Sequence, residues 1–471
     1  MGAGLRLARA FRQKVWDADF PINPAGCRIF YGWIVVLVGT VGVLGSLPGQ
    51  TIGVSVFTDR LIEDTGLTRT QLSMTYLIGT VLSGLLIPYS GRKLDRIGSR
   101  RMAMLAGCGM AAALVLLSFS GWIGSHLGEP GGGLEGICWL GMMVWVSGGF
   151  FLLRLYGQGW LTLASRNMIG KWFNRRRGTA TAINGLAVSI VFSLSPWVFE
   201  QLIREIGWER LWQMMAAMVV LIFVPLAWAF FRDNPEECGL QMDGGDGRKS
   251  GRKPNRDLLM VHEFTLPEVL RNRAFWVVSL AMTLQAFFST AFTFHILSVA
   301  EDLQVRKEAL LAALVPSALV ASVFTVASGW LIDRFRIKWM VVLFCAGMLT
   351  ASMGLMVAPS SIWLPLFVLG SGITGGTFIT VSGTLYPRYF GRKALGAITG
   401  VSMAGLVYGS AVAPFAFSLS LDWTGSYRAG IGAVAGLSGL LLAFSFRVDN
   451  PQRTLARAME GTDSRGATVE K

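Results

Sequence analysis

The chain has 471 residues, of which 52% are hydrophobic and only 15% are charged, and its mean hydropathy is +0.52. A soluble chain carries roughly a quarter of its residues as charges, so the composition excludes an ordinary soluble protein and predicts one domain built in lipid. The 57 glycines and 16 tryptophans suit closely packed membrane helices with aromatic residues at both interfaces.

Apolar runs of the length that crosses a bilayer, about 20 residues, recur along the whole chain. In order they cover residues 33–56, 72–88, 102–121, 139–165, 179–199, 211–231, 274–299, 310–332, 339–357, 362–385, 394–419 and 429–446. The sequence therefore predicts an all-α membrane protein with twelve transmembrane helices.

The basic residues are distributed unevenly between the expected loops. With a cytoplasmic N-terminus, 34 of the 42 Lys and Arg residues fall in cytoplasmic segments and seven in external loops. This asymmetry predicts a multi-pass protein of the plasma (inner) membrane with both termini cytoplasmic. It also explains the net charge of +14 without a nucleic-acid partner, because the longest polar stretch, 232–273, carries eight acidic residues as well.

The first 30 residues are expected to be a cytoplasmic segment. Within them Leu7, Phe11 and Val15 recur at helical spacing among basic residues, which fits an interfacial helix or a disordered tail. The first apolar run begins only after this segment and is long enough to span the bilayer, so we expect a retained first helix and no cleaved signal peptide.

The two halves of the chain share landmarks in the same order. Gly178, after the fourth run, precedes Gly396, after the tenth, by 218 positions, and the sixth and twelfth runs both end in Asp-Asn-Pro, beginning at Asp233 and Asp449. Such self-similarity predicts two related halves. We expect six-helix halves at 31–231 and 274–446, a cytoplasmic linker at 232–273 and a tail at 447–471, with a solute site between the halves near the bilayer midplane.

A dense motif lies between the second and third runs. It matches the pattern G-x-x-x-D-R-x-G-x-R-R with Gly91, Asp95, Arg96, Gly98, Arg100 and Arg101. Glycines at two of these positions permit tight turns, and an aspartate near the start of the third helix suits the helix dipole.

This motif resembles the signature of the major facilitator superfamily, and the resemblance covers about residues 31–447. It implies the twelve-helix fold of that family and a cytoplasmic latch between alternative states. A weaker second copy contains Asp333 and Arg334, with Arg336 and Lys338 at the positions of Gly98 and Arg100. The implied gating residues are thus Gly91, Asp95, Arg96, Gly98, Arg100, Asp333 and Arg334.

Shorter strings indicate a branch within this family. Arg154, Gly157 and Gly159 resemble a superfamily signature on the fourth helix, and the opening at 30–33 resembles the branch of monocarboxylate transporters and oxalate/formate antiporters. Members of that branch carry charges in helices eight and eleven, whereas the runs at 310–332 and 394–419 here have none. The identity of the substrate therefore cannot be inferred from any of these groups.

Arg154 is the one charged residue clearly inside an expected span, and intramembrane charges are functional candidates. It shares a helix face with Ser147, Gln158, Thr162 and Ser165. A guanidinium matches a carboxylate in bidentate fashion, so Arg154 is a candidate for binding an anionic solute. The alternative is that it hydrogen-bonds a broken helix or a neighbouring span and holds the fold together.

The resemblance implies that helices one, four, seven and ten line the solute cavity. Besides Arg154 and Gln158, the candidate solute-binding residues on these helices are Gln50, Gln285, Ser289, Thr293 and Thr377. For Ser and Thr the alternative is packing between helices. His295, near the external end of the seventh run, is a candidate for proton coupling, with a capping role as the alternative.

These features predict a secondary or facilitative transporter, functional as a monomer, that moves a small organic anion such as a mono- or dicarboxylate by alternating access. No Asp or Glu lies well inside an expected span, which favours exchange, uniport or solute-borne proton coupling. An exporter of amphiphilic compounds is the alternative, with Trp145, Tyr156, Trp160 and Phe287 in its cavity.

Two other classes of protein fit less well. A nutrient sensor would need a cytosolic signalling domain for which the linker and tail are too short. An enzyme would need a nucleophile with its base, a phosphate-binding loop or metal-ligand spacing, so we predict no enzymatic activity, no cofactor and no metal.

Overall fold

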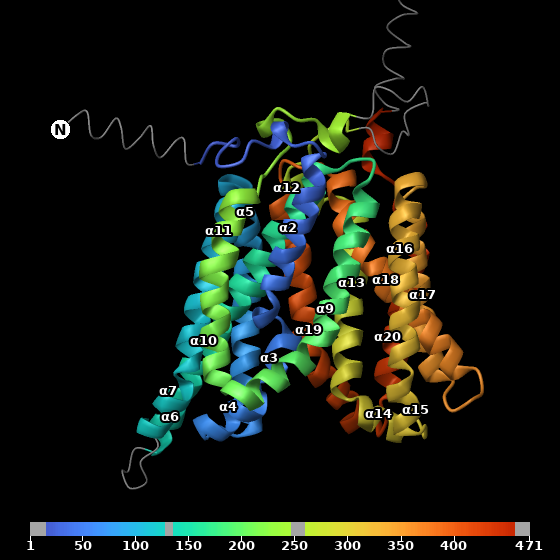
Figure 1. Cartoon of the computed structure of the whole chain (residues 1–471). Coiled ribbons are helices and arrows are strands. Elements are labelled where there is room, and N and C mark those ends of the chain that lie inside the picture. The colour runs from blue at the N-terminus through green and yellow to red at the C-terminus, as the bar shows by residue number, and fades with distance from the viewer. Residues whose placement is uncertain (1–15, 128–134, 246–259, 457–471) are drawn as a thin grey trace, which may run out of the picture. The chain divides into compact units, whose positions relative to one another are not determined.

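The computed structural model describes residues 16–127, 135–245 and 260–456, and within these ranges every regular element is a helix. Ten helices in this part of the chain are long and apolar enough to cross a membrane. One of them contains Gly98 with a φ of 80°, which breaks it into two spans, and the shorter apolar helix α2 (Tyr31–Gly45) lies in the first expected span. All twelve expected spans therefore have helical counterparts. Figure 1 shows the arrangement of these helices.

The first six spans are built from several labelled pieces. They are α2 with α3 (Thr51–Ser55); α5 (Arg69–Ser118), which supplies two spans; α7 (Glu135–Leu153), η3 (Arg154–Leu161) and α8 (Thr162–Trp172); α9 (Arg177–Ile206); and α10 (Trp208–Met218), η4 (Val219–Phe223) and α11 (Val224–Phe230).

The last six spans follow a short helix, α12 (Leu266–Leu270). They are α13 (Arg273–Phe294) with α14 (Ile296–Asp302); α15 (Lys307–Ala312) with α16 (Leu314–Arg334); α17 (Lys338–Met356); α18 (Trp363–Tyr389); α19 (Leu395–Thr424); and α20 (Arg428–Ser445).

Local chemistry sets several of these ends. Thr68 and Gln71 form a reciprocal capping box at the start of α5, and the Asn272 side chain caps α13. Gly425 ends α19 with a φ of 71°, a left-handed conformation that glycine adopts without strain. These residues determine where a helix begins or ends, whereas its apolar length determines whether it can cross the membrane.

Two parts of the chain differ from the sequence expectations or lie outside the described residues. The segment between the third and fourth expected spans is partly helical, because α6 (Ser120–Leu127) and the start of α7 occupy its ends, while residues 128–134 lie outside the described part. The helix considered for the N-terminal segment falls on residues 5–16, of which all but Trp16 also lie outside the described part.

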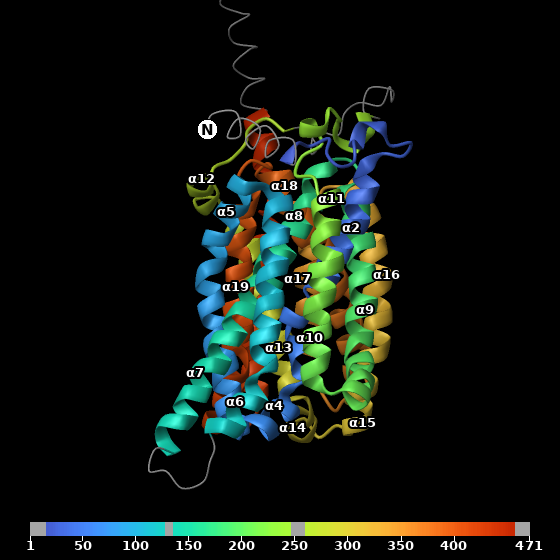
Figure 2. The ribbon, with the colours of Figure 1, turned by 60° about the vertical axis from the view of Figure 1, so that its left-hand side comes forward.

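The chain divides into two compact units. Unit 1 comprises Met1–Gly79, Arg96–Asn174 and Ala187–Arg252, and unit 2 comprises Thr80–Asp95, Arg175–Leu186 and Lys253–Lys471. Two short segments of the first half, the second part of the second span and the start of α9, thus belong to unit 2. Within each unit the long helices run side by side (Figures 1 and 2).

The linker distinguishes one end of each unit. The end of unit 1 at which the linker leaves α11, and the end of unit 2 at which it enters α13, are the linker-side ends. Two apolar clusters fill unit 2, one around Phe275, Phe344 and Tyr386 near its linker-side end and one around Phe292, Phe367 and Tyr427.

Candidate functional site

The first span is interrupted in its middle. After α2, Leu47–Gly49 form the short 3-10 turn η2, and Gln50 is extended (φ −91°, ψ 154°) before α3 begins. A Cβ on Gly49 would lie 2.8 Å from the Cα of Gly157 and 2.5 Å from the carbonyl oxygen of Leu153. Gly49 and Gly157 therefore let the broken segment lie directly on the backbone of the fourth span.

The fourth span is irregular at the same level. Its segment η3 is π-helical, and α8 continues the helix beyond it. Single π-helical turns occur often at functional sites, and discontinuous helices form the solute sites of many transporters. The facing irregularities in spans one and four make this part of unit 1 the best candidate site.

Arg154 begins the π-helical segment and is almost completely enclosed, with 2% of its surface exposed. Its Nη1 donates to the carbonyl oxygen of Gly49 at 3.3 Å and to Oγ1 of Thr51 at 3.2 Å. The guanidinium lies 5.3 Å from the centroid of the Tyr76 ring. These bonds fit the alternative role of Arg154, in which it holds the fold together, because they satisfy the broken backbone of the first span.

The charge of Arg154 nevertheless has no counter-ion among the described residues. No ion pair to it is formed, and its buried Nε has no hydrogen-bond partner there. A buried charge inside a membrane span costs free energy unless something pairs with it. This guanidinium therefore remains a group that an anion would stabilise.

A polar cluster surrounds the interruption. Oγ1 of Thr162 donates to Oγ of Ser46 at 3.0 Å, and Nε2 of Gln50 donates to both hydroxyls, at 3.1 and 3.0 Å. Gln158, one turn before Thr162, is half-buried. Spacing on the fourth helix had predicted this polar face, and the structure joins it to Gln50 of the first span.

The candidates on the seventh span form an accessible stripe in unit 2. Gln285 is half-buried and Ser289 and Thr293 are exposed, at positions four apart on α13. Their side chains are free of hydrogen bonds to other described residues, so they are available to water or solute.

Thr377, on α18, lies in a different environment. It is completely buried, and its hydroxyl donates to the carbonyl oxygen of Ile373 on its own helix at 2.6 Å. Thr374, Thr380 and Thr384 of the same helix are also buried. In this conformation the threonines of α18 serve packing between helices.

His295 lies between α13 and α14 and is half-buried. Its Nε2 lies 3.0 Å from the carbonyl oxygen of Pro414, and its Nδ1 lies 3.3 Å from Oη of Tyr427. A neutral imidazole that donates from Nε2 and accepts at Nδ1 satisfies both contacts.

The aromatic residues of the exporter alternative are engaged in packing. Trp160 is buried and meets Tyr156 edge to face at 5.2 Å, while Phe287 packs on Phe417. Nε1 of Trp145 donates to Ser120. These rings contribute to the core of their own units.

Arg166 was not among the predicted site residues. The expected fourth span ended at Ser165, whereas the helix continues through α8 to Trp172, so Arg166 lies within a span-length helix. The spacing of four residues between Thr162 and Arg166, which places both on one side of a helix, is the sequence feature that could have identified it.

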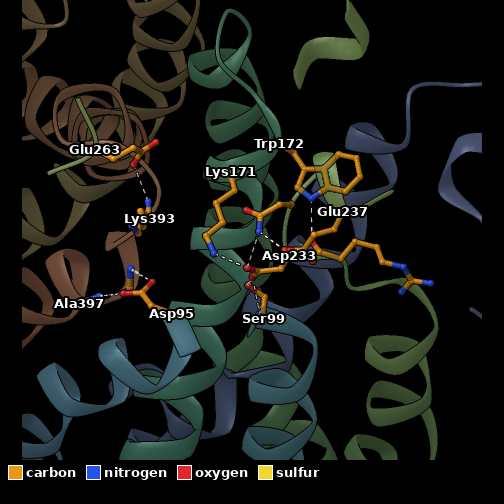
Figure 3. Close-up of polar contacts among 12 residues, drawn as sticks. Asp95, Ser99, Lys171, Trp172, Asp233, Glu237, Glu263, Lys393 and Ala397 are labelled. Carbon is orange, nitrogen blue, oxygen red and sulfur yellow. Dashed lines mark hydrogen bonds and ion pairs between the residues drawn. The ribbon is translucent and has the colours of Figure 1, made fainter. Parts of the chain in front are cut away.

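Asp95 of the motif at 91–101 binds the start of another helix within unit 2. Its carboxylate accepts hydrogen bonds from the backbone N–H of Gly396 at 2.7 Å and of Ala397 at 2.8 Å, the second and third residues of α19 (Figure 3). Negative charge is favourable at a helix N-terminus. Asp95 lies before the break at Gly98, so the expected position near the start of the third helix is corrected: its charge serves α19.

Asp333 does the same for α9. Its carboxylate accepts from the backbone N–H of Gly178 at 2.7 Å and of Thr179 at 2.9 Å, and from Oγ1 of Thr179 at 2.7 Å. Arg388 lies 3.6 Å from the same carboxylate. The second copy of the motif therefore keeps the central contact despite its weaker sequence.

Glycines permit the close approach at both places. A Cβ on Gly91 would lie 2.0 Å from the carbonyl oxygen of Gly396, and one on Gly178 would lie 2.3 Å from that of Gly329. Such distances are sterically forbidden. Each of these close backbone approaches lies beside one of the two aspartate contacts.

The remaining motif residues have separate roles. Arg100 is buried and donates to the carbonyl oxygens of Trp228, Asp17 and Phe20, which ties the segment before the first span to the third and sixth spans. Arg334 lies 3.8 Å above the ring of Trp330. Arg96 is exposed.

Asp233, a landmark of the internal repeat, caps the third span. Its carboxylate accepts from the backbone N–H and Oγ of Ser99 at 2.9 and 2.6 Å and pairs with Nζ of Lys171 at 2.7 Å (Figure 3). Burial alone would raise the pKa of this carboxyl, but Lys171 and Ser99 lower it below its ordinary value. The equivalent Asp449 pairs with Arg336 and Lys338 in unit 2.

The linker contributes two contacts that sequence alone did not indicate. Asp243 accepts from the backbone N–H of Asn174 at 3.0 Å in unit 1. In unit 2, Glu263 accepts from the backbone N–H groups of Arg392 and Lys393 at 2.7 and 2.9 Å (Figure 3). Each linker carboxylate thus holds one of the two repeated basic loops.

Comparison with known proteins agrees with this architecture. Residues 38–372 match the family model described as Major Facilitator Superfamily. No curated protein sequence matches the chain significantly. Similar solved structures include the proton:xylose symporter XylE, with a TM-score of 0.63, 17% identity and coverage of 90% of this chain and 98% of that one.

Two further solved structures share the fold. The human organic anion transporter MFSD10 has a TM-score of 0.55 and 15% identity, with 88% of this chain and 99% of that one covered. A bacterial homologue of the iron transporter ferroportin in an outward-facing state has a TM-score of 0.64 and 13% identity, with 88% and 99% covered. Because these proteins handle different solutes at such low identity, the likeness concerns the fold alone.

Proposed function

Because this chain belongs to the major facilitator superfamily, a family of membrane transporters, we propose that it moves a small organic anion, a mono- or dicarboxylate, across the membrane by alternating access. The chain would act as a monomer in the plasma (inner) membrane with both termini in the cytoplasm. The proposed orientation rests on the 34 of 42 basic residues in the expected cytoplasmic segments.

The observation that carries the anion proposal is the unneutralised charge of Arg154. The side chain is 2% exposed in a membrane-spanning helix, and no acidic side chain among the described residues pairs with it. A carboxylate would supply the missing negative charge and accept the guanidinium hydrogen bonds. The interrupted first span beside it supplies the kind of irregular backbone at which transporters hold solutes.

Accessible polar side chains support a solute path in each unit. Gln50 and Gln158 in unit 1 are half-buried, and Gln285, Ser289 and Thr293 in unit 2 have free hydrogen-bonding groups. Neutral donors of this kind orient a small solute while a single charge supplies the attraction.

The gating proposal concerns the linker-side contacts. Hydrogen bonds join Asp95 to the start of α19 and Asp333 to the start of α9, and a change of conformation would have to break them. We infer that these contacts exist in one state of the transport cycle and are released in the other. We also propose that the chain belongs to the branch of monocarboxylate transporters and oxalate/formate antiporters.

Coupling to protons would fall to the solute or to His295. The imidazole contacts the carbonyl oxygen of Pro414 and the hydroxyl of Tyr427 at the junction of α13 and α14. Exchange of anions or uniport requires no such group.

Uptake into proteoliposomes tests the proposal. The panel contains formate, acetate, lactate, pyruvate, oxalate, malonate and succinate, with xylose as the neutral solute, each with and without a pH gradient and with unlabelled solute preloaded. We expect uptake of at least one carboxylate above protein-free liposomes and no saturable uptake of xylose. Stimulation by preloading would indicate exchange, and dependence on the gradient would indicate symport.

Arg154→Gln tests the anion site within this assay. We expect the variant to lose most carboxylate uptake. Unchanged uptake would remove Arg154 from the site, and saturable uptake of xylose but of no carboxylate by the wild-type protein would overturn the anion proposal as a whole.

A further inference from the structure

Arg166 is the exception on an otherwise enclosed helix. Among the residues of α8, Thr162–Trp172, it alone is exposed, whereas its neighbours along the helix are buried. Ser165, the preceding residue, packs so closely on the first span that a Cβ on Gly42 would lie 2.2 Å from its Oγ. The helix is therefore surrounded by protein except in the direction of Arg166.

This direction continues the polar face of the candidate site. Gln158, Thr162 and Arg166 follow one another at intervals of four, the spacing of residues on one side of a helix. Thr162 is bonded to Gln50 of the first span, so the face is anchored to the interrupted segment. Arg166 lies at its linker-side end.

The guanidinium of Arg166 has no hydrogen bond or ion pair to another described residue. Lys171, five residues further along, is by contrast paired with Asp233 at 2.7 Å. Arg166 lies six residues before the end of α8, about 9 Å along a helix with a rise of 1.5 Å per residue. A free cation at this depth is expensive on a lipid-facing surface and is expected to face water or solute.

We propose that Arg166 is a second anion contact of the transporter, which binds the carboxylate of the solute at the linker-side end of the polar face. The inference rests on the proposed anion transport and adds a residue to the same site. Gln158, eight residues away, supplies neutral hydrogen-bonding groups to the rest of the solute.

The spacing of the two cations defines the class of solute. Arg154 and Arg166 are twelve residues apart, which is at most about 18 Å along the helix, because the π-helical segment Arg154–Leu161 rises less per residue than an α-helix. A small dicarboxylate is far too short to reach both guanidinium groups at once, so each binds an anionic group separately. A solute with one carboxylate is sufficient, and we expect monocarboxylates to be transported at least as well as dicarboxylates of similar size.

Uptake kinetics of Arg166→Gln test this inference. The probe is whichever of lactate and pyruvate the wild-type protein takes up faster. We expect KM to rise at least tenfold, because a charge-assisted hydrogen bond contributes about a tenfold to hundredfold effect. Arg166→Lys should retain a KM within a few-fold of the wild type, and Arg271→Gln, an exposed arginine just outside a span, should not change it.

Labelling covers the case in which Arg166→Gln does not fold. In Arg166→Cys, modification by a charged thiol reagent, measured above that of the wild-type cysteines, should be slowed by lactate or pyruvate. A folded Arg166→Gln protein with KM within twofold of the wild type, or an Arg166→Cys thiol that the solute does not protect, would overturn the inference. Absence of any carboxylate uptake by the wild type would instead refute the proposed function.

Discussion

Asp95 and Asp333 make the same contact at equivalent places in the two halves of the sequence: each carboxylate accepts the backbone N–H groups at the start of a helix from the other half. The bonds are 2.7 to 2.9 Å long, in the range of charge-assisted hydrogen bonds. The two sites thus combine ionic attraction with the positive end of a helix dipole.

Asp95→Asn should weaken the contact with the start of α19, and Asp333→Asn should weaken the contact with the start of α9. Asparagine keeps the shape but loses the charge, and we expect each change to cost about 1.5–3 kcal/mol, the range for hydrogen bonds to charged groups. Spin labels at positions 92 and 393, both exposed in unit 2, should report a growing population at longer distance.

Asp422→Asn is the matched control for these variants, because Asp422 is exposed at the far end of α19. It should leave the distance distribution unchanged. If the double variant of Asp95 and Asp333 also leaves it unchanged, the two aspartates do not stabilise this state.

Gly91→Ala and Gly178→Ala should disrupt the same contacts by steric overlap. The added methyl groups would lie 2.0 Å and 2.3 Å from carbonyl oxygens, so the helices must separate, at a cost of about 1–3 kcal/mol. Thermal unfolding in detergent measures the loss. Gly436→Ala, where nothing lies within 4 Å of the new Cβ, should keep the wild-type midpoint.

The pair of Lys171 and Asp233 should be a major source of stability in unit 1. The side chains are 5% and 15% exposed, and removal of one partner leaves a buried charge, so Asp233→Asn or Lys171→Met should cost about 3–5 kcal/mol. The double variant should be more stable than the sum of the single effects predicts. Asp59→Asn, in an exposed pair with Arg69, should change the unfolding midpoint little.

The same pair predicts a pH dependence. The pKa of the Asp233 carboxyl is lowered on folding from an ordinary value of 3.8, since Lys171 and Ser99 outweigh the effect of burial. Its contribution is therefore complete at neutral pH and is lost as the pH falls below about 4, through the lowered pKa. Unfolding of the wild type and of Asp233→Asn should differ most above that range, and a constant difference down to pH 2 would contradict the assignment.

Arg154→Gln should destabilise the interrupted first span independently of any solute. The variant loses the bonds to Gly49 and Thr51, and we expect a cost of about 1–3 kcal/mol, measured by thermal unfolding without solute. If stability is unchanged while uptake is lost, the role of Arg154 is confined to the solute. Loss of stability with normal uptake would confine it to the fold.

The spans could be predicted from the sequence, as could the place of the motif at 91–101 in the chain, because each depends on local properties. Apolar length decides which segments cross the membrane, and residues 91–101 match a pattern whose spacing is itself informative. The prediction for Asp95 was wrong in one respect: its partners Gly396 and Ala397 lie some 300 positions away, and no local pattern identifies them.

Tertiary structure alone decided the character of the candidate site. Gly49 and Gly157 bring an interrupted helix against a π-helical one, which leaves Arg154 enclosed at the backbone break. The end of the fourth span, and with it the place of Arg166, followed from α8 continuing to Trp172. The apolar pattern identifies which segments cross the membrane, because it depends on local sequence alone. The exposure and hydrogen-bond partners of each polar side chain depend on neighbours that lie far away in the sequence.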